Sequence, residues 1–210
     1  MATARAWSNA HASASRSTAR ARVERRRGCV VIRASGGDEK EGVSYDVPYD
    51  VVNGGSEDGY ELRVYGAYYV AATPYENREE GLATLMEYME GGNAERAMYP
   101  PTQPLTTRYF EGGKTMELAL LGRRAKESIA APNEESEVRV IASGAELVAA
   151  VGFEGNATPE VAEFYRSKLV AALKANGMAC SNEQEFRINT FGPLYSLKTR
   201  QNELLVKVEV

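Results

Sequence analysis

The chain repeats one pattern of residues in its two halves. The segment Glu-Leu-Arg-Val-Tyr at 61–65 is echoed by Glu-Val-Arg-Val-Ile at 137–141, which lies 76 positions later. The segment Ala-Tyr-Tyr-Val-Ala-Ala at 67–72 is echoed by Ala-Glu-Leu-Val-Ala-Ala at 145–150, which lies 78 positions later. A single echo at this spacing is too long for a solenoid and favours one domain with two pseudo-symmetric halves. We expect a groove where the halves meet, and a ligand would bind there.

Each half is predicted to run strand, strand, helix, strand, strand. Strands at 60–66 and 67–73 are expected to form a hairpin with Gly66 near its turn. Residues 99–104 are expected to form a rigid, exposed crossover, because their Pro residues lack the N–H group that a central strand needs. Further strands are expected at 45–53, 105–110, 114–121, 137–142, 145–153, 185–191 and 203–209. These elements favour a mixed sheet or distorted barrel with two helices packed outside it.

Both helices have recognisable ends. The first is predicted to begin after Asn77, which can cap it, and to end at Gly91. The second is predicted to begin after Thr158, with Pro159 in its first turn, and to end at Gly177. One apolar stripe follows the first helix at spacings of three and four residues, and it consists of Leu82, Leu85, Met86 and Met89.

Residues 1–34 differ in composition from the rest of the chain. They contain eight Arg residues and a single acidic residue, Glu24, among many Ala and Ser residues. This composition is typical of an organelle transit peptide, and a chloroplast address fits it better than a mitochondrial one. The alternative is a disordered basic arm that binds nucleic acid. We therefore expect a chloroplast transit peptide at 1–34, a flexible Gly-rich linker at 35–44 and a folded domain at 45–210.

Removal of residues 1–34 makes the remaining chain strongly acidic. It would retain 17 of the 25 basic residues and 28 of the 29 acidic residues, which gives a net charge of −11. Such a domain repels a phosphate backbone, so nucleic acid is not expected as a partner. No apolar run reaches the length that spans a membrane.

The expected domain carries few reactive side chains. His11 and Cys29 lie in the predicted transit peptide, so residues 35–210 contain no His and one Cys, Cys180. Ser-His-Asp and Cys-His catalytic systems are therefore excluded in their usual forms, and Cys180 alone cannot build a zinc site. No Asp follows Asp58, which disfavours an Asp cluster for Mg²⁺ or Ca²⁺. We predict a non-enzymatic protein with no catalytic residue and no metal site.

Several segments, in this order and spacing, resemble the SOUL haem-binding family. They are Tyr-Glu-Leu-Arg-Val-Tyr-Gly at 60–66, Leu-Met-Glu-Tyr-Met-Glu-Gly-Gly-Asn at 85–93, Thr-Gln-Pro-Leu at 102–105, Phe-Gly-Pro at 191–193 and Arg-Gln-Asn-Glu at 200–203. The resemblance covers roughly residues 45–210. It implies an α+β fold, a distorted antiparallel or mixed β-barrel with two long helices and an internal duplication. It also implies non-covalent binding of haem or another tetrapyrrole in a shallow groove beside the first helix.

The resemblance suggests which residues would bind the cofactor. Val64 stands where some family members have a haem-ligating His, and Glu79 and Glu87 stand where others have basic residues. Binding would then rest on apolar burial without a His ligand, and an axial ligand would have to be Tyr, Met or Cys180. The alternative is that the stripe is core packing, the usual role of Met and Leu on a helix. The predicted cofactor-binding residues are Arg78, Leu82, Leu85, Met86 and Met89.

Three functions remain open from the sequence. The first is a plastid carrier or buffer for haem or a related tetrapyrrole. The second is an interaction or scaffold module that keeps the SOUL fold but has lost haem binding, and that associates peripherally with plastid membranes, lipid bodies or a protein assembly. The third is an enzyme that uses Glu residues or Cys180, and no nucleophile–base pair supports it. The expected fold also resembles bacterial effector-binding domains that capture diverse small molecules, which leaves the identity of the ligand open.

Overall fold

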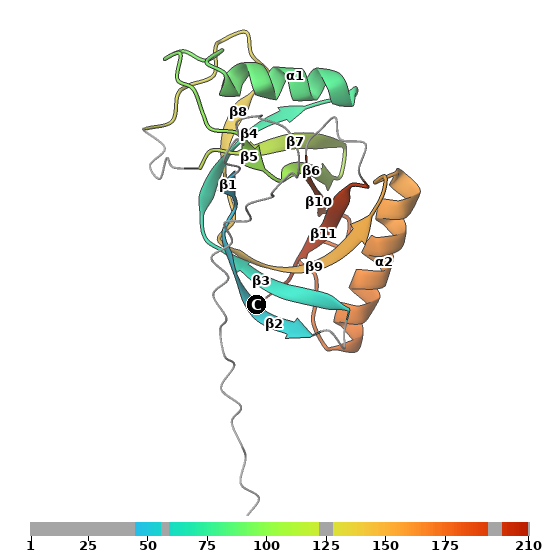
Figure 1. Cartoon of the computed structure of the whole chain (residues 1–210). Helices are drawn as coiled ribbons and strands as arrows, with labels where there is room; N and C mark the ends of the chain where they lie inside the picture. Colours follow the sequence, from blue (N-terminus) through green and yellow to red (C-terminus); the bar gives the residue numbers. More distant parts are fainter. Residues whose placement is uncertain (1–44, 56–58, 122–127, 193–198, 210) are drawn as a thin grey trace, which may run out of the picture.

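Figure 1 shows the computed structural model, which describes residues 45–55, 59–121, 128–192 and 199–209. The predicted transit peptide and linker, at 1–44, lie outside the described residues. The fold is α+β, as predicted: nine antiparallel strands form one sheet that curls into a half-barrel, and two helices pack against it. Neither helix is long and apolar enough to cross a membrane, as judged over the described residues.

The nine strands are β2 (Tyr49–Gly55), β3 (Tyr60–Tyr65), β4 (Tyr68–Pro74), β6 (Leu105–Phe110), β7 (Gly113–Ala119), β8 (Arg139–Ser143), β9 (Glu146–Glu154), β10 (Phe186–Phe191) and β11 (Gln201–Lys207). Their order in the sheet is β2-β3-β9-β11-β10-β6-β7-β4-β8. Because β2 and β8 are the edges, the sheet is an open curl rather than a closed barrel. Beside it, the two-residue strands β1 (Tyr45–Asp46) and β5 (Thr102–Gln103) pair in parallel.

The predicted hairpin of the first two strands is wrong. β3 lies between β2 and β9, whereas β4 lies between β7 and β8. The opening strand of each half therefore pairs with the second strand of the other half. Exchanging β3, β4, β6 and β7 for β8, β9, β10 and β11 leaves their strand order unchanged. That symmetry concerns topology alone, and an internal duplication stays a prediction.

The two helices begin where the sequence predicted. α1 (Arg78–Met89) is capped by Asn77, whose side-chain oxygen accepts a 2.9 Å hydrogen bond from the Glu79 N–H. α2 (Pro159–Ala175) is capped by Thr158, whose Oγ1 accepts a bond from the Val161 N–H. α1 packs on β4 and β7, and α2 packs on β9 and β11 (Figure 1). Each helix thus covers one part of the outer face of the sheet.

Alternate side chains of each strand face opposite sides of the sheet. In β11, Leu204 and Val206 pack under α2, whereas Leu205 faces inward. In β7, Met116 and Leu118 pack under α1, whereas Ala119 faces inward. The inward-facing apolar cluster contains no residue of either helix; it consists of Val47, Tyr65, Ala119, Val148, Ala150 and Leu205. The sheet therefore has an outer face sealed by helices and a concave face without them.

The segment predicted to be an exposed crossover is partly buried. Tyr99 stacks on Tyr88 of α1 with 5.6 Å between ring centroids, and its hydroxyl accepts a hydrogen bond from the Ala130 N–H. Thr102 and Gln103 form β5 and pair with β1. The Pro residues keep this segment out of the central sheet, as expected, but its aromatic side chain gains more from burial than from exposure.

Candidate ligand-binding site

The concave face of the sheet contains a pocket of about 410 Å³. This volume lies within the range of roughly 300–1,000 Å³ that small-molecule sites occupy. Its apolar floor includes Val70, Ala119 and Leu205, which come from three different strands. The segment from Asp46 to Tyr49 forms part of the wall. We call this cavity the concave pocket.

Aromatic rings line one side of the concave pocket. The ring centroids of Tyr49 and Tyr65 lie 5.3 Å apart, and those of Tyr65 and Tyr68 lie 6.4 Å apart. Phe191 contributes a fourth ring. Tyr65 is only 5% exposed, and this burial raises the pKa of its phenol to about 12. The wall therefore presents neutral rings against which a flat apolar molecule can pack.

A buried ion pair supports the same wall. The two Nη atoms of Arg63 donate hydrogen bonds of 2.8 Å to the two carboxylate oxygens of Glu203, a bidentate arrangement. The Nε atom of Arg63 donates to Glu61, and its guanidinium lies 4.3 Å from the centroid of the Tyr49 ring. Burial by itself would lower the pKa of Arg63, but the hydrogen bond and charge of Glu203 outweigh it and raise the pKa. Arg63 is thus fully engaged.

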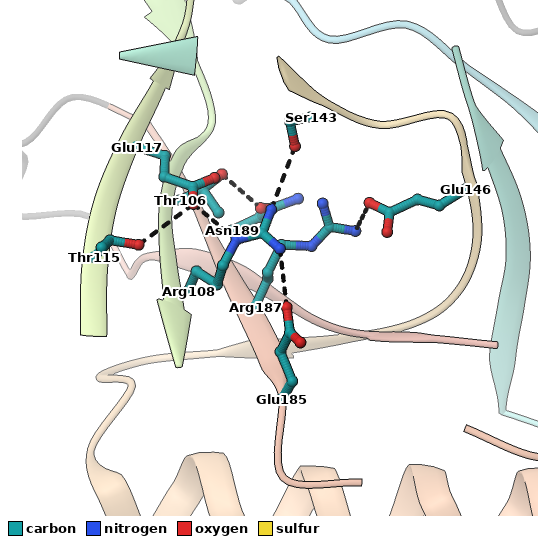
Figure 2. Close-up of polar contacts among 9 residues, drawn as sticks. All are labelled: Thr106, Arg108, Thr115, Glu117, Ser143, Glu146, Glu185, Arg187 and Asn189. Carbon is teal, nitrogen blue, oxygen red and sulfur yellow. Dashed lines mark hydrogen bonds and ion pairs between the residues drawn. The ribbon is translucent and has the colours of Figure 1, made fainter. Parts of the chain in front are cut away.

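Two further arginines form ion pairs on the concave side (Figure 2). Arg108 donates through Nε to Glu117 at 2.8 Å and through Nη1 to Glu185 at 3.1 Å. The Nη2 atom of Arg187 lies 2.7 Å from Glu146 Oε1, an ionic contact whose angle is not that of a hydrogen bond. Glu117 is only 2% exposed, and its bond to Arg108 offsets the cost of burying a carboxylate.

Asp46 differs from the other carboxylates of the pocket. Glu117 and Glu203 are each paired with an Arg, whereas no hydrogen bond or ion pair joins the Asp46 side chain to another part of the described chain. Partial burial raises the pKa of Asp46 above its ordinary value. Among the described lining residues, the acids Asp46, Glu117 and Glu203 face a single base, Arg187. The concave pocket is therefore apolar and aromatic with an excess of negative charge.

The predicted cofactor-binding stripe lies elsewhere. Leu85 and Met89 of α1 are 0% and 3% exposed and belong to the core between the helix and the sheet. Leu82 and Met86 are partly buried against the same core. The Arg78 Nη2 atom is buried at the start of α1 without a hydrogen-bond partner. None of these five residues lines the concave pocket. Leu85 and Met89 thus act as core residues here, and a ligand-binding role for the stripe stays a prediction.

The positions of the family's alternative haem contacts also lie outside the concave pocket. Val64 is 39% exposed and points to the opposite face of β3 from Tyr65. Glu79 and Glu87 are exposed on α1. The thiol of Cys180 is partly buried, which raises its pKa, and it does not line the pocket. The lining includes no His, Cys or Met, and no metal-binding group of three His, Cys, Asp or Glu occurs among the described residues.

The sequence predicted a groove where the two halves meet, but it did not indicate which residues line the concave pocket. Along β3, charged residues alternate with apolar ones, a pattern that usually marks a solvent-facing side. Arg63 and Glu203 are 140 positions apart, so their pairing is not visible without the fold. The available signal was the placement of aromatic residues, because Tyr49, Tyr65 and Tyr68 lie in the first three predicted strands.

Comparisons with known proteins agree on the architecture. The family described as SOUL heme-binding protein matches residues 44–207. No curated protein matches the chain. A hydrolase encoded by lin2189 from Listeria innocua is 9% identical with a TM-score of 0.53, over 72% of this chain and 92% of that one. The EcmrR C-terminal domain is 13% identical with a TM-score of 0.51, over 71% and 96%. At these identities the two structures share the fold alone with this chain.

Proposed function

Because the chain belongs to the SOUL heme-binding protein family, we propose that it binds haem or a related tetrapyrrole without catalysing a reaction, as a carrier or buffer in the plastid. The match over residues 44–207 is the observation that carries this proposal. The composition of residues 1–34, rich in Arg, Ser and Ala, supports the plastid address.

We assign the macrocycle to the concave pocket rather than to a groove on α1. The pocket is a formed cavity with an apolar floor and aromatic walls, whereas Leu85 and Met89 are packed inside the core. Each 100 Å² of apolar ligand surface removed from water there would contribute about 2.5 kcal/mol. Part of that gain is offset by the loss of ligand freedom on binding. The residues of the pocket therefore fit a flat, largely apolar ligand.

The donor set of the pocket favours binding by burial without a His ligand. The expected domain, residues 35–210, contains no His, and the described lining residues of the pocket contain no sulfur atom. The phenol of Tyr65 holds its proton well above neutral pH, because burial raises its pKa to about 12. Phenolate is the form of Tyr that ligates haem iron. When bound, haem would bring its own iron chemistry, and this chain would contribute shape, aromatic contacts and exclusion of water.

A haem titration of the full-length protein tests the proposal. We expect a saturable Soret change with one site per chain, and the same change in a His11→Ala variant, since His11 is the single imidazole of the sequence. Absence of a saturable change in both proteins would refute tetrapyrrole binding. That result would favour the alternative, an interaction or scaffold module that keeps the fold, associated with plastid membranes or lipid bodies.

Two variants test where the ligand binds. Ala119→Phe adds a ring to the pocket floor and should weaken haem binding by at least about tenfold. Leu82→Glu places a charge on the partly buried side of α1 and should leave haem affinity nearly unchanged. Circular dichroism checks that both variants fold. The opposite ranking of the two variants would assign the site to α1, as the sequence first predicted.

Import into isolated chloroplasts tests the plastid address. Residues 1–44 fused to a fluorescent protein should direct it into the organelle, where the leader is removed. A matched fusion in which the eight Arg residues of the leader are changed to Gln should not be imported. If neither fusion were imported, the proposed localisation would be contradicted. The proposal of ligand binding would be unaffected.

A further inference from the structure

We propose that the concave pocket selects tetrapyrroles by the placement of their carboxylates. It accepts a macrocycle whose carboxylates lie along one edge and excludes a macrocycle with carboxylates around the whole ring. This inference rests on the proposed function and adds to it the chemical class of the ligand. It follows from the charges in the wall and from the engagement of every nearby guanidinium.

The wall of the pocket disfavours anions. Asp46, Glu117 and Glu203 line it, and Arg187 is the single basic residue among its described lining residues. A ligand carboxylate inside this space would approach like charges in surroundings of low dielectric, where their repulsion is stronger than in water. An apolar ligand edge meets no such opposition, because Val70, Ala119 and Leu205 form the floor.

The guanidinium groups on this face are already in use. Both Nη atoms of Arg63 bind Glu203, and its Nε binds Glu61. Arg108 is held by Glu117, Glu185 and Ser143. A carboxylate of the ligand could reach one of these groups only by displacing a carboxylate of the protein, which would then be left buried and unpaired.

Arg187 also faces a carboxylate of the protein, but through an ionic contact rather than hydrogen bonds. Its Nη2 atom lies 2.7 Å from Glu146, and both side chains are about nine-tenths buried. Figure 2 shows the Arg187 and Arg108 side chains directed toward acidic partners from neighbouring elements. A ligand carboxylate that approached Arg187 would have to compete with Glu146, in a pocket that three protein carboxylates also line, so we expect such a group to remain in solvent.

This requirement separates tetrapyrroles by their substituents. Protoporphyrin and haem carry two propionates on adjacent rings, so the opposite edge of the macrocycle is apolar and can enter the pocket. Coproporphyrin carries a propionate on each of its four rings, so every orientation would drive a carboxylate into the acidic wall. The dimethyl ester of protoporphyrin carries no carboxylate and meets no repulsion in any orientation.

A fluorescence titration with metal-free probes tests the selection. The full-length protein is titrated with protoporphyrin IX, its dimethyl ester and coproporphyrin III in one detergent-containing buffer. We expect the ester to bind at least as tightly as the diacid, and coproporphyrin to bind at least about tenfold more weakly. Equal affinity for coproporphyrin and protoporphyrin would overturn the inference and leave the proposed function intact. Binding of none of the three probes would refute the proposed function and this inference with it.

Matched variants test the origin of the selection. Asp46→Asn removes the lining carboxylate that has no Arg partner, so it should tighten coproporphyrin binding several-fold and change the affinity of the ester little. Asp50→Asn makes the same change in β2 at a residue that does not line the pocket, and it should alter neither the coproporphyrin affinity nor the ester affinity. A coproporphyrin affinity that does not respond to Asp46→Asn, or responds equally to Asp50→Asn, would contradict control by the pocket wall.

Discussion

The two faces of the curled sheet are built from the same strands and differ in what covers them. On the outer face, α1 and α2 seal apolar side chains such as Leu85 and Leu204 into continuous cores. The concave face is covered by neither α1 nor α2, and Arg–Glu pairs and tyrosine rings surround a pocket there instead. The comparison indicates that the outer face supplies stability and the concave face supplies space for a ligand.

The largest expected effect comes from the outer face. Leu85→Ala removes a fully buried side chain under α1 and should lower the free energy of unfolding by about 3–5 kcal/mol, because a cavity remains. Urea denaturation measures this change. Haem affinity of the folded fraction should not change. Loss of haem binding by a Leu85→Ala protein that is still folded would break the division between the two faces.

On the concave face, Glu117→Gln removes the charge of one member of a buried ion pair. It should destabilise the protein by about 2–3 kcal/mol, less than the roughly 3–5 kcal/mol that removing one partner of a buried pair usually costs, because Arg108 keeps Glu185 as a partner. Urea denaturation measures the change. Glu79→Gln on the exposed surface of α1 is the control and should change stability by less than about 0.5 kcal/mol. Equal effects of the two substitutions would show that the concave charges are not needed for folding.

The aromatic wall should make stability depend on alkaline pH. Burial raises the pKa of Tyr65 to about 12 in the folded state, so between the ordinary phenol pKa of about 10 and that value the unfolded state releases a proton that the folded state retains. Stability that is fully present below pH 10 is therefore lost as pH rises toward 12, by about 2–3 kcal/mol for this residue. In Tyr65→Phe this loss should shrink, as urea denaturation at several pH values would report. An unchanged pH dependence in Tyr65→Phe would assign the alkaline loss to other tyrosines.

The smallest expected effect tests the helix that seals the outer face. Asn77→Ala removes the cap that accepts the Glu79 N–H and should cost about 1 kcal/mol of stability. Thr158→Ala at the start of α2 is the matched change, with a similar expected cost, since Thr158 accepts from the Val161 N–H. Thermal unfolding followed by circular dichroism measures both. If only one of the two substitutions lowered stability, the helix at the other position would be held by packing without its cap.

Local features of the fold could be predicted from the sequence, and non-local ones could not. Asn77 and Thr158 each satisfy backbone groups within three positions, so the helix starts are visible in a short window. The strands that pair with β3 and β4 are not visible in such a window, because alternation along a strand indicates which face is buried and not which strand lies beside it. The predicted hairpin at Gly66 failed for this reason.

The candidate site was the harder inference for the same reason. Leu85 and Met89 have the spacing of a core stripe and of a binding stripe, and only the packed sheet separates the two. Arg63 and Glu203 each look like a surface charge, and they meet beside the pocket only after β3, β9 and β11 are aligned. The family resemblance indicated the fold and the ligand class, which depend on overall pattern, but not the face of the sheet.

At the centre of the strand order, β6 and β10 join the two halves of the sheet, and Thr106 donates a 2.9 Å hydrogen bond across this seam to Asn189. Both residues belong to the pocket, so a sliding motion of one half along the other would reshape the chamber. Ligand occupancy of the pocket and the rigidity of the β6–β10 pairing are therefore linked. We expect a bound macrocycle to slow amide exchange in β6 and β10 more than in the edge strands β2 and β8.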